Sequence, residues 1–89
     1  MRTAWDHIEI GLRFLKRGDL PAAEAVFRAA TAADPHCVEA WYNLAWTLDE
    51  QGRYREAGEA VMRAVELDTD WPDAKANLER CRVLAELAG

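Results

Sequence analysis

Two histidines and two cysteines are the side chains of this sequence best suited to catalysis or metal binding. His36 and Cys37 are adjacent and Asp34 is close by, which is the residue set of a Cys–His nucleophile. Such a nucleophile needs converging side chains and a third group that orients the base, whereas adjacent residues at a helix start point apart. We therefore interpret His36 and Cys37 as a pair of residues at a helix junction.

A zinc site is the second chemistry that these side chains could support. His7, His36, Cys37 and Cys81 do not show any recognised spacing of zinc ligands. The glycines do not form a phosphate-binding loop pattern, and the acidic residues are expected on solvated helix faces or at helix caps. We predict no catalytic residue, no metal and no other cofactor, so the chain is not expected to be an enzyme.

The composition is typical of a small soluble globular protein. Of 89 residues, 51% are hydrophobic and 30% are charged, and the formal net charge is −5. This charge argues against a nucleic-acid partner, because such binding depends on a basic surface.

No apolar run reaches the roughly 18 residues that indicate a membrane span, and the start lacks a signal-peptide pattern. Two lone cysteines suggest no disulfide framework, and we expect a cytoplasmic protein.

The stretch from Ala40 to Ala57 shows how such a chain can fold. Trp41, Leu44, Ala45 and Leu48 are spaced three and four residues apart and share one helical face. Gly52 follows where the chain must reverse, because glycine adopts positive φ without a steric penalty. Ala57 then supplies a small side chain on the returning helix. The stretch predicts two antiparallel helices joined by a tight turn.

The same unit recurs at a spacing of 34 residues. Ile10, Gly11 and Phe14 occupy the positions of Leu44, Ala45 and Leu48. The further equivalent pairs are Gly18 and Gly52, Ala23 and Ala57, Phe27 and Val61, Ala30 and Ala64, Asp34 and Asp68, Ala40 and Ala74, Asn43 and Asn77, and Leu44 and Leu78. A fixed period of this length indicates a stacked helical-repeat protein.

This pattern resembles the tetratricopeptide repeat family, whose first helix carries W-x2-L-G-x2-Y and whose second carries A-x3-F before a closing proline. Three positions depart from it: Ala45 replaces the glycine, Thr69 replaces the proline that Pro35 supplies, and His7 stands in the place of Trp41. The resemblance implies an all-α, right-handed superhelix of antiparallel helix pairs with five helices. It divides a single domain, 1–89, into repeats at about 4–37 and 38–71 and a capping helix at about 72–88.

The helices are expected at about Thr3–Arg17, Leu20–Ala33, His36–Gln51, Tyr54–Leu67 and from Asp70–Asp73 to about Ala88. Asp34 is a candidate N-cap for the third helix, and Gly58 is interpreted as a point of close helix approach. The first helix carries apolar residues outside its packing face, and the last helix does so near its end. These extra residues are Trp5, Ile8, Leu12 and Leu15, and Val83, Leu84 and Leu87.

In the family that the chain resembles, the first helix of each repeat lines a concave groove that holds a peptide or a partner's helix. Position by position, the groove would hold Trp5, Ile8, Leu12, Tyr42, Asn43, Trp46, Asp49, Asn77 and Arg80, together with Glu9, Glu39, Asp73 and Ala76. Tryptophan and tyrosine are frequent anchors of interfaces. The alternative is that the aromatic rings shield the core and that the asparagines reflect repeat equivalence alone.

The function expected from the resemblance is protein–protein interaction, as an adaptor or scaffold that binds a protein or peptide of unknown identity. The alternative is self-association as a homodimer in which the exposed apolar stripes bury one another. No nucleic acid, membrane or cofactor is expected as a partner.

Overall fold

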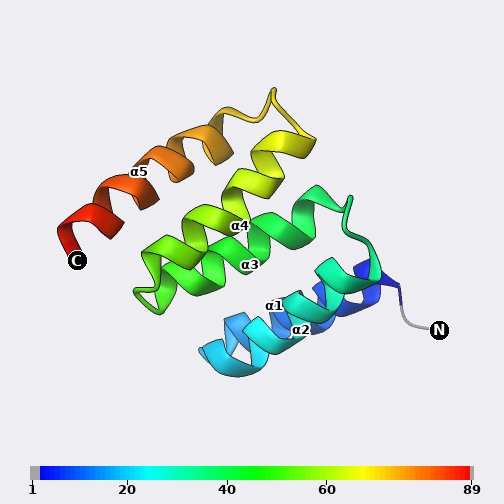
Figure 1. Ribbon diagram of the computed structural model, residues 1–89. Coiled ribbons are helices and arrows are strands. Elements are labelled where there is room, and N and C mark those ends of the chain that lie inside the picture. Colours follow the sequence, from blue (N-terminus) through cyan, green and yellow to red (C-terminus); the bar gives the residue numbers. More distant parts are fainter. Residues whose placement is uncertain (1–2, 89) are drawn as a thin grey trace.

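Helices and short turns make up the structure, a computed structural model that describes residues 3–88 (Figure 1). Within this range the helices are α1 (Ala4–Lys16), α2 (Leu20–Ala33), α3 (Val38–Glu50), α4 (Tyr54–Leu67) and α5 (Pro72–Ala88). The predicted all-α class is confirmed, and the predicted bounds of α2 and α4 match the observed ones.

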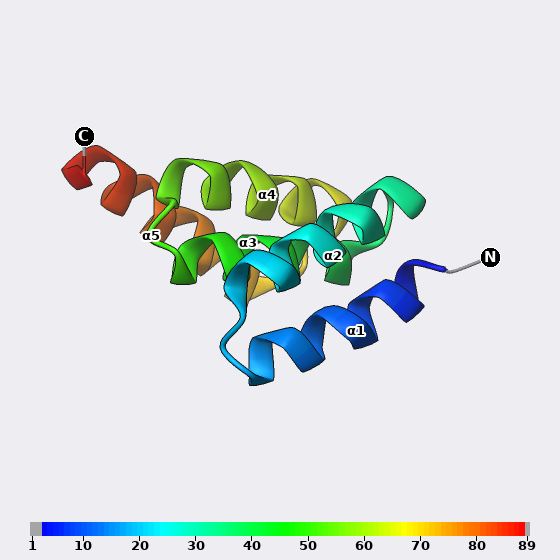
Figure 2. The same cartoon turned by 90° about the horizontal axis from the view of Figure 1, so that it is seen from below.

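Each helix packs on the next one in the chain, so the helices form a stack (Figures 1 and 2). The first helices of the two pairs, α1 and α3, also touch each other. This is the packing pattern of a helical-repeat solenoid, in which each unit contacts its neighbours.

The two glycine turns are built alike. Gly18 has φ 78° and Gly52 has φ 75°, the left-handed conformation that favours glycine. The amide of Gly18 donates to the carbonyl of Leu15 at 3.0 Å, and that of Asp19 donates to the carbonyl of Phe14 at 2.9 Å. The turn at Gly52 repeats both bonds at the equivalent positions. These bonds form a Schellman motif, which ends α1 and α3 and reverses the chain.

The N-terminal caps of the helices show one difference from the sequence prediction. Thr3 and Asp6 form a capping box at α1, and the Asp19 carboxylate accepts from the amide of Ala22 at α2. Asp34 was predicted to cap α3, and this prediction is wrong. Its side chain accepts from the amide of His36 at 3.0 Å, which forms a tight turn before α3 begins.

The core lies between the helix pairs and consists mainly of small and medium-sized apolar side chains. Its buried members are Ala23, Phe27, Leu44, Ala45, Leu48, Ala57, Ala60, Val61, Ala74 and Cys81. Gly11 in α1 lies directly against the α2 side chain Phe27, since an added Cβ would lie 2.4 Å from Cε1 of that ring. Only glycine fits at this position without displacing a fully buried ring.

Gly58 in α4 does not mark a comparably close contact. A Cβ added there would lie 3.6 Å from Cβ of Cys81, an ordinary van der Waals distance. This contact with Cys81 agrees with the interpretation of Gly58 as a point of helix approach, but it does not require glycine, because alanine would fit at this position.

Equivalent contacts join the successive repeats. Ile8 of α1 belongs to a buried cluster with Cys37 and Ala40 at the start of α3. One repeat later, Tyr42 of α3 stacks on Trp71 before α5, with ring centroids 4.5 Å apart. Ile8 is only 4% exposed, so the prediction that it lies on an exposed apolar stripe is wrong. The residues at the start of the next repeat cover it.

Candidate protein interface

The histidines and cysteines do not assemble into a reactive centre. Cys37 and Cys81 are buried free thiols, and burial is the main cause that raises the pKa of each above its usual range. A raised pKa keeps a thiol protonated and a poor nucleophile. His36 is exposed next to Cys37, and the described residues contain no group of three or more His, Cys, Asp or Glu that could hold a metal ion.

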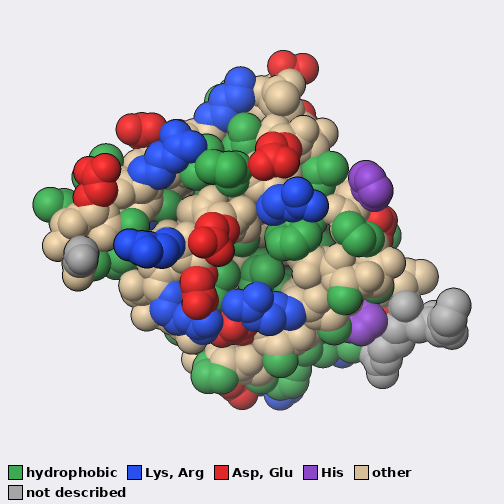
Figure 3. Space-filling view, viewed as in Figure 1, with side chains coloured by type: hydrophobic (Ala, Val, Ile, Leu, Met, Phe, Trp, Pro, Cys, Tyr) green, Lys and Arg blue, Asp and Glu red, His purple; other side chains and the backbone are tan. Residues whose placement is uncertain are grey.

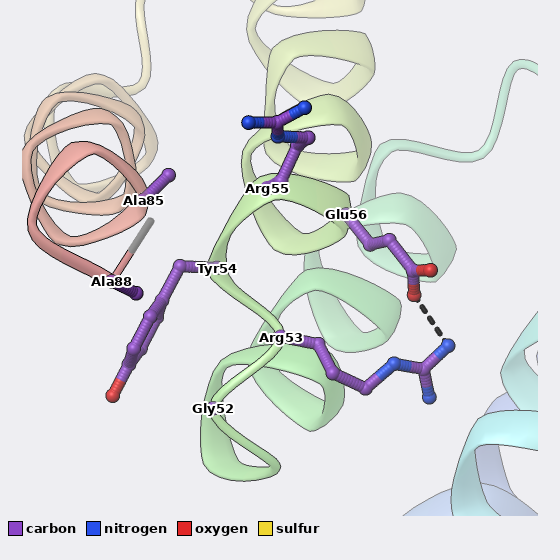
Figure 4. A pocket seen from close by; sticks show the side chains of 7 residues that line it. All are labelled: Gly52, Arg53, Tyr54, Arg55, Glu56, Ala85 and Ala88. Carbon is purple, nitrogen blue, oxygen red and sulfur yellow. Dashed lines mark ion pairs between the residues drawn. The ribbon is translucent and has the colours of Figure 1, made fainter.

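A hollow of about 360 Å³ lies where the start of α4 meets the end of α5 (Figure 4). Arg53 turns away from α5 to pair with Glu56, while the Tyr54 ring points toward the end of α5 near Ala85 and Ala88. Its lining therefore offers a phenol, the guanidinium of Arg55, an ion pair and methyl groups. These groups do not form an acid–base or nucleophilic set.

The surface with the features of a binding site lies on α1, α3 and α5. Each helix presents four residues at spacings of four, three and four, which place them on one helical face. The three sets are repeat equivalents, and none of their residues is buried. We call these residues the inner face: Trp5, Glu9, Leu12 and Lys16 on α1; Glu39, Asn43, Trp46 and Glu50 on α3; and Asp73, Asn77, Arg80 and Leu84 on α5.

Large apolar side chains stand out on the inner face. Trp5 is 59% exposed, and Leu12 and Trp46 are each 46% exposed. Leu12 and Trp46 occupy the same repeat position, and Asn43 and Asn77 lie half-buried in the adjacent row. Tyr42 is half-buried beside this surface and packs against the core as well as Trp71. Trp46 therefore lies at the surface, whereas Tyr42 packs in the junction between repeats.

An ion pair crosses from α3 to α5 at the edge of the inner face. Nη1 of Arg80 lies 2.5 Å from Oδ2 of Asp49. The Asp49 side chain is 11% exposed and that of Arg80 is 53% exposed. The hydrogen bond to Asp49, followed by its charge, raises the pKa of Arg80. Asp49 was predicted as a groove residue, and its observed contact is with Arg80, another predicted groove residue.

The opposite surface, formed by α2 and α4, carries interspersed basic and acidic side chains (Figure 3). At its centre, Glu24 of α2 accepts hydrogen bonds from Gln51 at 3.0 Å and from Arg53 at 2.5 Å, and pairs with Arg28 at 2.9 Å. Burial by itself raises the pKa of Glu24, but the bonds from Gln51, Arg28 and Arg53 outweigh it, and the net pKa is lowered. This network joins α2 to the turn between α3 and α4.

Three members of the inner face lie outside the groove predicted from the sequence: Lys16, Glu50 and Leu84. The signal that could have found them is the same 34-residue spacing that identified the other rows, continued by one helical turn. Glu50 and Lys16 are exposed, and Leu84 is half-buried.

No helix within residues 3–88 is long and apolar enough to cross a membrane. A family model described as tetratricopeptide repeat matches residues 8–74, which is more than half of the chain.

Proposed function

Because the chain belongs to the tetratricopeptide repeat family, whose repeats generally mediate protein–protein interactions, we propose that the inner face binds a segment of a partner protein. The observation that carries this proposal is the exposure of Trp46 and Leu12 at one repeat position. Large apolar side chains at the surface add little to folding, but they contribute strongly at the centre of an interface. The half-buried Asn43 and Asn77 offer amide groups that could bind the backbone of an extended segment.

Burial and packing support a smaller set of partner-binding residues than the sequence suggested. Ile8 is buried and Tyr42 is engaged with Trp71, so we assign both to the junctions between repeats. Asp49 holds Arg80 in place and contributes indirectly. The residues that we propose to contact the partner are Trp5, Leu12, Asn43, Trp46, Asn77 and Arg80.

The test compares Trp46→Ala with Leu67→Ala as baits in a quantitative pull-down from cell lysate. Leu67 is 38% exposed at the end of α4, outside the inner face, and is therefore a matched control. We expect both variants to keep the helical circular dichroism spectrum of the parent, because each side chain is more than one-third exposed and belongs to no fully buried cluster. Partners captured by the parent and by Leu67→Ala should be lost with Trp46→Ala, since an anchor aromatic contributes about 2 kcal/mol or more. An unchanged set of captured proteins would argue against the inner face.

Self-association through α5 is a second candidate function. Ala76 is the repeat equivalent of Ile8 and Tyr42, both of which the next repeat covers. At Ala76 there is instead an open hollow of about 560 Å³, lined also by Glu79, Arg80, Val83 and Leu84. Val83 is 47% exposed and Leu87 is 79% exposed. Exposed apolar patches of this kind are typical of interaction sites.

The α1 end of the stack favours a two-fold arrangement over head-to-tail stacking. Ala40 and Ala74 are fully buried where each repeat meets the one before it, and Asp6 occupies the equivalent position in α1. A copy stacked onto α1 would bury this carboxylate, which is costly. Pairing of α5 with α5 about a two-fold axis leaves Asp6 outside the contact, and the charged residues that line the α5 hollow, Glu79 and Arg80, are of opposite sign.

A further inference from the structure

The charges on the inner face are unequal. It carries four carboxylates, Glu9, Glu39, Glu50 and Asp73, and two cations, Lys16 and Arg80. Arg80 is already paired with Asp49 at 2.5 Å, so Lys16 is the one cation of this face that lacks an ion pair within the described residues. The central helix α3 contains three acidic residues and no basic ones. The inner face is therefore a negatively charged surface with apolar side chains at its centre.

The acids of the inner face differ from several on the opposite face in how they are neutralised. Glu24, Glu56 and Glu66 on α2 and α4 each pair with an arginine. Within residues 3–88, no ion pair neutralises Glu9, Glu39, Glu50 or Asp73. Their negative charge is thus available to a ligand.

A stabilising interaction with the helix dipole accounts for the positions of only two of these four acidic residues. Glu39 and Asp73 lie in the first turns of α3 and α5, where the helix dipole favours a negative charge. Glu50 is the last residue of α3, where the same dipole disfavours a negative charge, and Glu9 lies in the middle of α1. Glu9 and Glu50 therefore have no stabilising role of this kind.

Trp46 lies on the same face of α3 as Glu50, four residues away. An exposed indole close to a carboxylate is suited to the side chain of lysine or arginine, whose methylene groups pack on the ring while the cation meets the acid. The chain already contains a contact of this type, because the guanidinium of Arg63 lies 5.5 Å from the ring centroid of Trp41.

From these observations, and resting on the proposed function above, we propose that the inner face binds a basic and apolar peptide segment. Large apolar side chains of the segment would contact Leu12 and Trp46, and its lysine or arginine side chains would meet Glu9 and Glu50. Charge complementarity of this kind determines partner choice and the rate of association more than the final affinity.

The experiment uses a phage-displayed library of short random peptides, selected on the immobilised 89-residue chain and depleted on Trp46→Ala. We expect the enriched peptides to carry net positive charge and at least one large apolar residue. Their synthetic forms should bind the parent chain more weakly as salt increases, because salt screens exposed charges. The double variant Glu9→Gln/Glu50→Gln should weaken binding by about tenfold, since each exposed pair contributes a factor of about two to five.

A matched control separates this effect from the change in total charge. Glu59 and Glu86 line the hollow between α4 and α5, outside the inner face, and Glu59→Gln/Glu86→Gln removes the same two charges. This control should leave binding within about twofold, because neither carboxylate lies on the inner face.

The outcomes distinguish the partner chemistry from the proposed function. Enrichment of neutral or acidic peptides that require Trp46 would overturn the basic partner and leave the inner face as a binding surface. Equal loss of binding in both double variants would also overturn it, because the effect would then come from total charge. If no enriched peptide depends on Trp46, the proposed function fails, and the inference fails with it.

Discussion

At the residue scale, two glycines in comparable helix interiors should respond in opposite ways to alanine. Gly58→Ala should raise the free energy of unfolding by about 0.5–1 kcal/mol, because alanine favours the helix and its Cβ would meet Cys81 at an ordinary distance of 3.6 Å. Gly11→Ala should lower it by about 1–3 kcal/mol through overpacking against the buried ring of Phe27. Urea denaturation followed by circular dichroism measures both changes.

The sequence did not predict which side chain packs against either glycine, and the reason is physical. Helix propensity treats them alike, whereas the outcome depends on which side chain the opposite helix brings to each position. That side chain is a phenylalanine for Gly11 and a cysteine for Gly58. A destabilised Gly58→Ala variant would mean that the added Cβ comes closer to Cβ of Cys81 than 3.6 Å.

Ile8 illustrates the same limit for the candidate site. Its spacing with Trp5 and Leu12 on α1 predicts an exposed apolar stripe, and the spacing is correct for Trp5 and Leu12. Ile8 lies at the edge of this stripe, where Cys37 and Ala40 of the next repeat bury it. Helical periodicity identifies the residues of a face, but the neighbouring repeat decides which of them remain exposed.

At the element scale, the ion pair between α3 and α5 should respond asymmetrically to the loss of either partner. Arg80→Ala leaves the 11% exposed carboxylate of Asp49 without its cation, and Oδ1 of Asp49 is already buried without a hydrogen-bond donor among the described residues. Asp49→Ala instead leaves a 53% exposed guanidinium, which water can hydrate. We expect Arg80→Ala to cost about 1–3 kcal/mol and Asp49→Ala to cost less.

Thermal unfolding of the two variants and of the double variant measures this difference. The double variant should be close to Asp49→Ala in stability, because removing both partners leaves no buried charge unpaired. Equal losses in the two single variants would contradict the asymmetry, and would show that solvent reaches Asp49 in the absence of Arg80.

The Glu24 network, which joins α2 to the turn between α3 and α4, should make stability depend on pH. The folded pKa of Glu24 lies below its usual value of 4.5. A lowered folded pKa means that the stabilisation is present above the unfolded pKa and is lost as pH falls through the folded pKa. Glu24→Gln should therefore lower the free energy of unfolding by about 1 kcal/mol near neutral pH. Glu59→Gln, which removes an exposed carboxylate from α4, is the control.

In acid, below pH 4.5 and through the lowered folded pKa, the difference between the parent and Glu24→Gln should shrink. Chemical denaturation across this pH range measures it. A difference that stays constant down to strongly acidic pH would indicate that the carboxylate does not act through its charge.

At the scale of the whole molecule, the repeat period predicted most of the fold. Equivalent glycines at positions 18 and 52 correctly predicted both reversals, because a left-handed residue is required there in each repeat. The junctions between repeats were harder to predict. Cys37 and Trp71 occupy equivalent positions and are chemically unlike, yet each covers the preceding repeat, one as a buried thiol and the other by stacking on Tyr42. Sequence similarity does not reveal an equivalence of this kind.

The oligomeric state depends on how the open faces at the two ends of the stack differ. Ala76, Val83 and Leu87 leave apolar side chains exposed at the α5 end, whereas Asp6 places a carboxylate at the α1 end, at the position where Ala40 is buried. Two apolar α5 faces can cover each other, and burial of apolar surface contributes about 25 cal/mol per Å². We therefore expect a homodimer at micromolar concentration or above, with a mass that light scattering during gel filtration can measure.

Val83→Glu should convert this dimer to a monomer, because the substitution places a carboxylate at the centre of the paired helices, where its burial is costly. The side chain is 47% exposed in the single chain, so the monomer should keep its helical circular dichroism and thermal stability. Leu12→Glu makes the same chemical change at a 46% exposed position of the inner face and should leave the dimer intact. A parent chain that remains monomeric at high concentration would exclude pairing through α5. A dimer that Leu12→Glu splits and Val83→Glu does not would instead place self-association on the inner face, where the same surface would then be closed to a partner peptide.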